Sequence, residues 1–293
     1  MEQREASNRN FNTISPSAKW VLLMKVHTSI PYAKQTAKLI EYPKKLEPDF
    51  DNTDLNFWRR TFHFESRYWS IDQLLEDLPI KNILELSAGF SFRGLDITHR
   101  KEVYYIDTDL PDIIARKKEL ISVIHTGDSD MKGELELLPL NALDEKNFDE
   151  IMSHFPPGEI VVVNEGLLIY LDTVEKEKLC GIIRKLLKEK GGYWITADIY
   201  LKLANHNIDL VVNDQTKKFL EDHNIENNKF ESFEVAAEFF KKMGFIIDKE
   251  ADIDFTKLSS FPYVVKNVEP EKISKMKDVD RVYTTWRLRL DNT

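Results

Sequence analysis

Short apolar runs alternate with longer amphipathic stretches along most of the chain. Helical periodicity follows Pro111–Ile124, Thr173–Lys190 and Ser232–Met243. Strand-like runs lie at Ile83–Glu85, Val103–Ile106, Leu135–Leu140, Ile160–Val163, Tyr193–Ala197, Phe245–Asp248 and Val282–Leu290. Strands that alternate with helices in this way predict a parallel sheet that is covered by helices on both faces.

The first 80 residues follow a helical pattern only. After a polar tail at 1–12, one helix is expected from Ser15 to about Ile40 and a second from about Leu55 to Leu78, before Pro79. Pro43 and Pro48 mark a break between them. We therefore expect an N-terminal helical cap at 1–80 and a main domain at 81–293.

Capping signals support the helix at Thr173–Lys190. Asp172 and Glu175 have the spacing of a capping box, and Gly191-Gly192 gives a stop. The stretch 200–231 is polar, helical and too long for an ordinary connection. It is interpreted either as a lid-like insertion over a site or as surface decoration.

Composition narrows the class of protein. The 293 residues are 42% hydrophobic and 11% aromatic, which is typical of a folded globular chain. The formal charge of -9 disfavours nucleic acid as a partner. The single cysteine, Cys180, excludes a disulfide framework, and His27, His63 and His206 have no partner at metal-ligand spacing, so no metal is expected. No apolar run is long enough to span a membrane and no signal peptide is visible, so a cytoplasmic protein is expected.

The sequence ILELSAGFSFRG, from Ile83 to Gly94, contains the first candidate site. In an open α/β sheet, ligands bind at the carboxyl ends of the strands, where the first turn brings backbone close to the ligand. Gly89 stands in that turn, and Ser87 and Ser91 occupy alternate positions where a glycine-rich turn would have further glycines. Serine still permits a close approach, provided that these positions do not need a positive φ.

Glu85 and Asp109 suggest the ligand. A carboxylate at Glu85 would repel the phosphates of NAD, but it suits a ligand with an amino group and no phosphate, such as S-adenosylmethionine. Asp109 follows the second strand, where a carboxylate can accept both ribose hydroxyls, and Asp107 is the alternative. The competing interpretations are an internally paired buried acid for Glu85 and an exposed loop acid for Asp109.

Two further positions follow the next strands. Asn141-Ala142 could bind an adenine edge, although Asn141 could equally be a turn residue. Glu165 follows the fourth strand within VVVNEGLLIYL, either as a second site carboxylate or as a solvated loop residue. An acid in so apolar a stretch should be partly buried and should need a partner.

These motifs together resemble the leucine carboxyl methyltransferase family, in particular its bacterial branch of S-adenosylmethionine-dependent O-methyltransferases. The similarity covers most of the chain. It rests on ISPSAKWVLLMKVHTSIPYA, SRYWSIDQLL, ILELSAGFSFRG, YYIDTDLPDIIARKKELI and VVVNEGLLIYL. It implies a class I methyltransferase, Rossmann-like, doubly wound sheet of seven strands, with the last strand antiparallel.

The resemblance also implies roles for individual residues. Arg67 would bind the cofactor carboxylate, the turn from Glu85 through Ser87 to Gly89 would hold the methionine end, and Asp109 would bind the ribose. Asn141 and Ala142 would bind the adenine, and Glu165 would lie near the methionine amine. Arg93 matches an arginine for which a structural role is expected.

Methyl transfer needs alignment and exclusion of water more than a catalytic triad. We expect the acceptor to be a carboxylate or hydroxyl of a small molecule or a peptide C-terminus. The N-terminal helices and the 200–231 insertion would form its pocket. Candidate pocket residues are Tyr32, Tyr170, Tyr200 and His206.

The chain departs from the family pattern at Ser87, at Ser91-Phe92 and at Asn141, where the family has glycine, Asp-Thr and an acid. These departures raise one alternative, a cofactor-binding regulatory module without activity. An NAD-dependent oxidoreductase is the other, opposed by Glu85 and by the final pair of strands.

Overall fold

The computed structural model describes residues 13, 15–40, 54–125, 131–202, 214–266 and 281–291. The predicted tail at 1–12, Pro43, Pro48, His206 and the part of the insertion at 203–213 lie outside the described residues.

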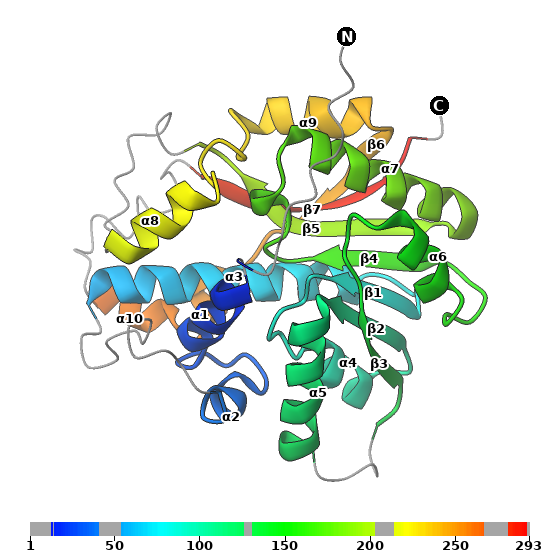
Figure 1. Ribbon diagram of the computed structural model, residues 1–293. Coiled ribbons are helices and arrows are strands. Elements are labelled where there is room, and N and C mark those ends of the chain that lie inside the picture. The colour runs from blue at the N-terminus through cyan, green and yellow to red at the C-terminus, as the bar shows by residue number, and fades with distance from the viewer. Residues whose placement is uncertain are drawn as a thin grey trace.

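A seven-stranded sheet forms the centre of the protein (Figure 1), with the strand order β3-β2-β1-β4-β5-β7-β6. β1 to β5 pair in parallel, and β7 pairs antiparallel with both β5 and β6. The strands are β1 Asn82–Leu86, β2 Tyr104–Asp109, β3 Glu134–Pro139, β4 Ile160–Asn164, β5 Gly192–Tyr200, β6 Phe245–Glu250 and β7 Tyr283–Leu290. This order confirms the predicted methyltransferase-type sheet with an antiparallel last strand.

Helices cover both faces of the sheet (Figure 1). One face packs against α6 (Glu145–Met152), α7 (Thr173–Lys190) and α9 (Phe233–Lys242) through the largest apolar cluster. The other packs against α3 (Leu55–Glu76) and α4 (Arg93–Arg100), with α5 (Pro111–Ile124) beside β2 and β3. The apolar runs at β1 and β4 are fully buried because helices lie on both sides of them.

The N-terminal region differs from the single helix expected between Ser15 and Ile40. It forms α1 (Ser15–Lys25) and a short α2 (Ala33–Ala37), with a turn between them. Pro31 has no N–H to donate, and Tyr32 has a φ of 63°, so the helix cannot continue through these residues. Both helices pack against the segment that follows β1, through Phe90, Phe92 and Leu95.

Most other predicted elements are confirmed. The helix expected from about Leu55 to Leu78 is α3. Helices α5 and α7 have the predicted bounds, and the capping box between Asp172 and Glu175 is present. α8 (Asp214–Asp222) lies in the stretch 200–231 that was expected to be helical, whereas α4, α6 and α10 (Phe261–Lys266), which are all short, were not predicted. Two 3₁₀ turns complete the described elements, η2 (Leu168–Tyr170) and η4 (Phe255–Lys257).

No helix within the described ranges has both the length and the apolar character needed to cross a membrane.

Gly192 at the start of β5 provides a test of this fold. It has a φ of 106°, and an added Cβ would lie 1.9 Å from the carbonyl oxygen of Ile160 on β4. Gly192→Ala should therefore lower the free energy of unfolding by about 2–3 kcal/mol. Urea denaturation measures this change.

Gly181 is the matched control, since it lies on the exposed side of α7 and an added Cβ would meet nothing within 4 Å. Gly181→Ala should raise the free energy of unfolding by about 1 kcal/mol through helix propensity. A Gly192→Ala protein as stable as the wild type would contradict the β4–β5 pairing described here.

Candidate functional site

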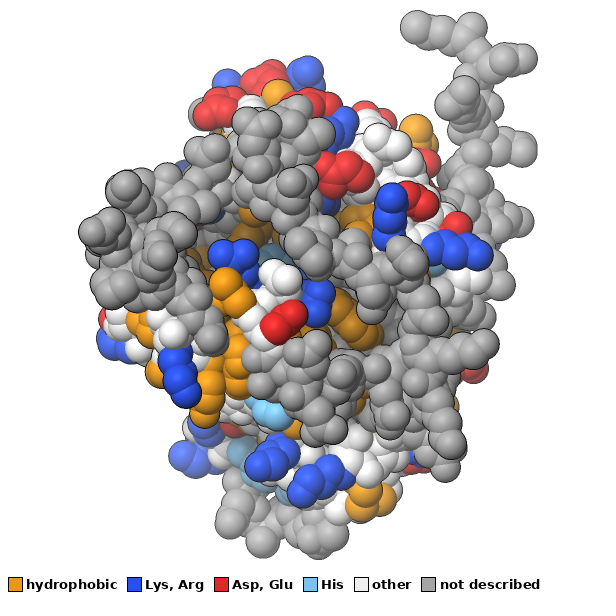
Figure 2. Space-filling model, turned by 90° about the vertical axis from the view of Figure 1, so that its left-hand side faces the viewer, with side chains coloured by type: hydrophobic (Ala, Val, Ile, Leu, Met, Phe, Trp, Pro, Cys, Tyr) orange, Lys and Arg blue, Asp and Glu red, His pale blue; other side chains and the backbone are white. Residues whose placement is uncertain are grey.

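Five of the predicted cofactor residues lie at the carboxyl ends of β1, β2 and β4, namely Glu85, Ser87, Gly89, Asp109 and Glu165. The chain crosses from β1 to β2 on one side, and β4 lies on the other side of β1, so the strand order reverses between β1 and β4. Ligands bind at such a switch point in open α/β sheets. The parallel strands point toward the left of Figure 1, and Figure 2 shows this side, where apolar side chains surround a few charged ones.

The turn after β1 has the geometry of a glycine-rich turn, although it contains one glycine. Ser87 and Gly89 have φ values of 52° and 54°. Serine at position 87 was expected to be compatible with a close approach only if no positive φ were needed. The structure shows that Ser87 adopts the left-handed conformation, which costs a non-glycine residue about 1–2 kcal/mol. An added Cβ on Gly89 would lie 3.3 Å from the Cβ of Ala18, so α1 packs directly over this turn.

Asp109 at the end of β2 holds the same turn. Its Oδ2 accepts a hydrogen bond of 2.7 Å from the backbone N–H of Gly89, and its Oδ1 accepts one of 2.7 Å from Leu110. Burial raises the pKa of Asp109, although these two N–H donors oppose the shift. The carboxylate therefore borders the turn and is only 9% exposed, which differs from the alternative of an exposed loop acid.

Asp107, the other candidate on β2, has a different environment. Its carboxylate pairs with Lys117 of α5 at 2.5 Å, and both side chains are almost completely buried. This internal ion pair ties α5 to β2. Asp107 is therefore committed to an internal ion pair, whereas Asp109 borders the turn after β1.

A fully buried guanidinium, that of Arg93 at the start of α4, lies beneath the turn. It pairs with Glu85 at 3.3 Å and Glu165 at 2.7 Å, and it makes a shorter contact with Asp72. It also donates to the carbonyl oxygen of Tyr68 at 2.9 Å. Arg93 therefore joins α3, β1 and the turn after β4 at one point.

Glu85 is committed to these internal partners. Its side chain has no exposed surface, one oxygen faces Arg93, and the other accepts a 2.7 Å hydrogen bond from the hydroxyl of Tyr105. Glu85 therefore has the environment of an internally paired buried acid, which was the competing interpretation of the sequence. Direct contact between Glu85 and a ligand amine would require these partners to move.

Glu165 attracts three cations. Lys25 of α1 lies 2.8 Å from its carboxylate, Arg93 lies 2.7 Å away, and Arg67 of α3 lies 3.9 Å away. Burial opposes ionisation, but the three positive charges outweigh it and lower the pKa of Glu165 to about 2. Glu165 was expected to be partly buried and to need a partner, and these three cations are its partners. Lys25 was not among the residues predicted for the site.

Asp198 near the end of β5 was also missed. Its carboxylate accepts backbone N–H groups of Gly166, Leu167 and Leu168 at 2.6–3.0 Å, and it lies 3.4 Å from Arg67. It thereby fixes the turn that carries Glu165. The signal was present, because an acid inside the apolar run WITADIY needs a partner.

Asn141 and Ala142 follow β3, next to Asp109. The Asn141 side chain is exposed, and its Oδ1 accepts a 3.0 Å hydrogen bond from the N–H of Leu143, which makes it a turn residue. Ala142 is buried. The hydrogen bond of 2.8 Å from Leu140 N–H to the carbonyl of Asp109 places this turn beside the end of β2.

The candidate acceptor residues do not all lie together. Tyr200, at the end of β5, has its ring 5.6 Å from the guanidinium carbon of Arg67. Tyr170 donates its hydroxyl to Ser17 of α1 at 3.1 Å and contacts Phe219 and His223, which lie in and just after α8. Tyr32 packs against Phe92 instead. His206 lies outside the described residues.

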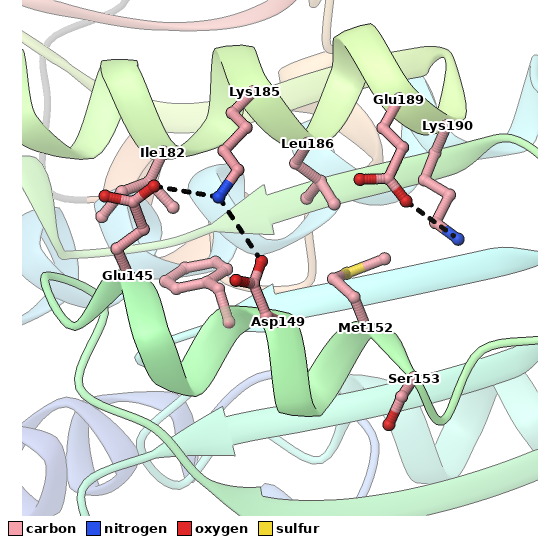
Figure 3. A pocket seen from close by; sticks show the side chains of 10 residues that line it. Glu145, Asp149, Met152, Ser153, Ile182, Lys185, Leu186, Glu189 and Lys190 are labelled. Atoms are coloured by element: carbon pink, nitrogen blue, oxygen red, sulfur yellow. Dashed lines mark hydrogen bonds and ion pairs between the residues drawn. The ribbon is translucent and has the colours of Figure 1, made fainter.

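A surface hollow lies elsewhere, between α6 and α7 (Figure 3). Its acidic and basic side chains pair with one another, with Lys185 3.0 Å from Glu145 and 3.7 Å from Asp149. None of the predicted site residues lines it. No group of His, Cys, Asp and Glu within the described ranges could hold a metal ion.

No protein-family model matches the sequence, and no curated protein sequence matches it. Solved structures with some similarity include three methyltransferases. Magnesium protoporphyrin IX methyltransferase from Synechocystis PCC 6803, with bound SAH, is 9% identical, with 89% of this chain and 96% of that chain covered and a TM-score of 0.46.

An O-methyltransferase family protein from Burkholderia thailandensis is 14% identical, with 96% and 70% covered and a TM-score of 0.46. A putative O-methyltransferase from Nostoc punctiforme PCC 73102 is 10% identical, with 93% and 71% covered and a TM-score of 0.47. At these identities and TM-scores, the similarities assign neither family nor ligand to this chain.

Glu165→Gln tests the electrostatics of the site. The folded-state pKa of about 2 lies below the ordinary value of 4.5, so ionised Glu165 stabilises the fold above about pH 5, and this stabilisation is lost as the pH falls toward 2. The substitution should lower the free energy of unfolding at pH 7 by about 3 kcal/mol, and this loss should shrink as the solution is acidified.

Urea denaturation from pH 7 down to pH 3 measures the difference. Glu177→Gln, at an exposed position on α7, is the control and should change stability little at any pH. A loss at Glu165 that stays constant with pH would show that the three cations do not lower its pKa.

Proposed function

We propose that the protein is an S-adenosylmethionine-dependent O-methyltransferase of the leucine carboxyl methyltransferase kind that its motifs resemble. One observation carries the proposal. The buried cluster of Lys25, Arg67 and Glu165 and the turn held by Asp109 meet at the switch point of a methyltransferase-type sheet. The two groups would meet the amino-acid end and the ribose of one cofactor.

The donor set fits that cofactor. Arg67 and Lys25 carry the positive charge that a methionine carboxylate needs, and Glu165 carries a carboxylate for the amine. The Nε of Arg67 is buried and finds no hydrogen-bond acceptor among the described residues, which suits a side chain that completes its contacts with a ligand. Glu85 lies beneath and adds negative charge without direct contact.

Asp109 would accept the ribose hydroxyls. A carboxylate has about four lone-pair sites, and backbone N–H groups use one on each oxygen, so acceptor capacity remains. The turn at Asn141 and Ala142 would border the adenine. The Asn141 oxygen already accepts the Leu143 N–H, so its amide N–H₂ is the group left to contact the base.

The residues of this chain would bind, align and exclude water. The bound cofactor supplies an activated methyl group on a sulfonium. Arg67, Lys25 and Glu165 would fix the orientation of its amino-acid end, while α1, packed over Gly89, would keep water from the reacting atoms. Tyr170 and Tyr200 stand on the Arg67 side of this position and would border an oxygen acceptor, a carboxylate or a hydroxyl of a small molecule or a peptide C-terminus.

A regulatory module that binds the cofactor without turnover is the second candidate. Ser87 motivates it, because a residue with a side chain adopts the left-handed conformation at a turn position where the family pattern has glycine.

Calorimetric titration with S-adenosylmethionine, S-adenosylhomocysteine and NAD tests the cofactor. Micromolar binding of the first two and none of NAD is expected. Asp109→Ala should weaken binding about tenfold or more, because it removes charge-assisted hydrogen bonds to the ribose.

Asp112→Ala is the matched control, since Asp112 is an exposed acid three residues further on, in the first turn of α5. It should bind the cofactor like the wild type. Failure of the unmodified protein to bind either methionine compound, or a preference for NAD, would sink the proposal.

A further inference from the structure

A polar aromatic cluster, made of His63, Tyr200 and Tyr283, lies beside the proposed methionine site. His63 on α3 and Tyr200 at the end of β5 form a hydrogen bond of 2.8 Å between Nε2 and the phenol oxygen. The ring of Tyr283 stacks on that of Tyr200 at 5.8 Å and meets the His63 ring edge-on at 4.5 Å. The hydroxyl of Tyr283 bonds instead to Ser66.

The position of this cluster follows from the fold. His63 and Arg67 are four residues apart on α3, so they lie on one face of the helix. Tyr200 is two residues beyond Asp198 on β5, and its ring lies 5.6 Å from the Arg67 guanidinium carbon. The His63–Tyr200 pair therefore borders the place where Arg67 would hold the amino-acid end of the cofactor.

The environment keeps His63 neutral. Burial, together with the positive charges of Arg67 and Lys229, lowers its pKa to about 3, although Glu165 opposes the shift. The titratable side chains that face His63 from the sheet are Tyr200 on β5 and Tyr283 on β7, and burial raises the pKa of both. A neutral imidazole can accept the Tyr200 proton at Nε2, which leaves the phenol oxygen able to accept a hydrogen bond from another hydroxyl.

The buried charged side chains around Arg93 and Glu165 disfavour an anionic acceptor. Lys25, Arg67 and Arg93 face Asp72, Glu85, Glu165 and Asp198, so these groups carry an excess of one negative charge. S-adenosylmethionine, with a net positive charge, offsets this excess, and the Asp109 carboxylate adds one more negative charge at the ribose end. An added carboxylate would be unpaired in this buried setting, whereas a neutral hydroxyl would not.

We propose that Tyr200 and His63 form a proton relay and that the methyl acceptor is therefore an alcohol or a phenol. This inference rests on the proposed methyltransferase function and deepens it. Tyr200 touches the acceptor, and His63 acts through Tyr200 as a positioning residue that takes up the proton.

The step balances. The acceptor O–H bond breaks, and its proton passes to the Tyr200 oxygen while the Tyr200 proton passes to Nε2 of His63. The acceptor oxygen forms the new bond to the methyl carbon, and the sulfur keeps the electron pair of the broken bond. His63 gains a positive charge as the sulfonium loses one, so the local charge is unchanged. A carboxylate acceptor would need none of this, because it has no proton to lose.

The test compares hydroxyl and carboxylate probes in the full-length protein. Formation of S-adenosylhomocysteine is measured with para-nitrophenol, catechol and octanol, each beside a carboxylate of similar skeleton, para-nitrobenzoate, phthalate and octanoate. Turnover of at least one hydroxyl compound and of no carboxylate is expected. Turnover of carboxylates alone, or of none of the hydroxyl compounds while S-adenosylmethionine binds, would overturn the proposal.

Two variants test the relay with the hydroxyl probe that reacts. Tyr200→Phe and His63→Gln should each lower kcat about 100-fold while the cofactor Kd is unchanged. Wild-type kcat should be nearly flat from pH 6 to pH 8. In His63→Gln it should rise about tenfold per pH unit, because the acceptor must then ionise without help.

Tyr283→Phe is the matched control, since that hydroxyl bonds to Ser66 rather than to His63. It should keep the wild-type kcat. Relay variants as fast as wild type, or with its flat pH profile, would contradict the relay. Loss of cofactor binding in the unmodified protein would instead refute the proposed function itself, and the relay with it.

Discussion

The site depends on one buried guanidinium. Arg93 contacts carboxylates from α3, β1 and the turn after β4, and none of these groups would tolerate burial alone. Removing one partner of a buried ion pair costs about 3–5 kcal/mol, because the remaining charge is left without compensation. The ion pairs therefore fix the relative position of three elements, and with them Arg67 on α3 and Glu165 on the turn.

The proposed chemistry follows from this arrangement. The ion pairs of Arg93 leave Arg67 and Lys25 facing Glu165. The excess of negative charge among these buried groups suits a cationic cofactor more than an anionic acceptor. Asp198 holds the Glu165 turn by three backbone N–H groups, and Asp109 holds the Gly89 turn by one. Both turns of the proposed site are thus preorganised by carboxylates at strand ends, which would reduce the cost of ordering them on binding.

The sequence predicted most of the sheet and the positions of Asp109 and Glu165, because strand ends and their turns are local features, whereas Arg67, inside α3, was expected only from the family resemblance. It did not predict the pairing of Arg93 with Asp72 or the approach of Lys25 to Glu165, which join residues far apart in the chain. The expected single helix from Ser15 to Ile40 ignores Pro31, which lies in the turn between α1 and α2 and has helical periodicity on both sides. The positive φ of Ser87 could not be read locally, since Asp109 and Thr108, at the end of the next strand, impose that turn.

The most direct measurement is a crystal structure of the protein grown with S-adenosylhomocysteine. We expect the ribose hydroxyls on the Asp109 carboxylate, the amino-acid carboxylate beside Arg67 and Lys25, and the amine beside Glu165. A nucleoside bound in another place, such as the hollow between α6 and α7, would contradict it. So would an amino-acid end that displaces Arg93 from Glu85, because the account treats that pair as the fixed base of the site.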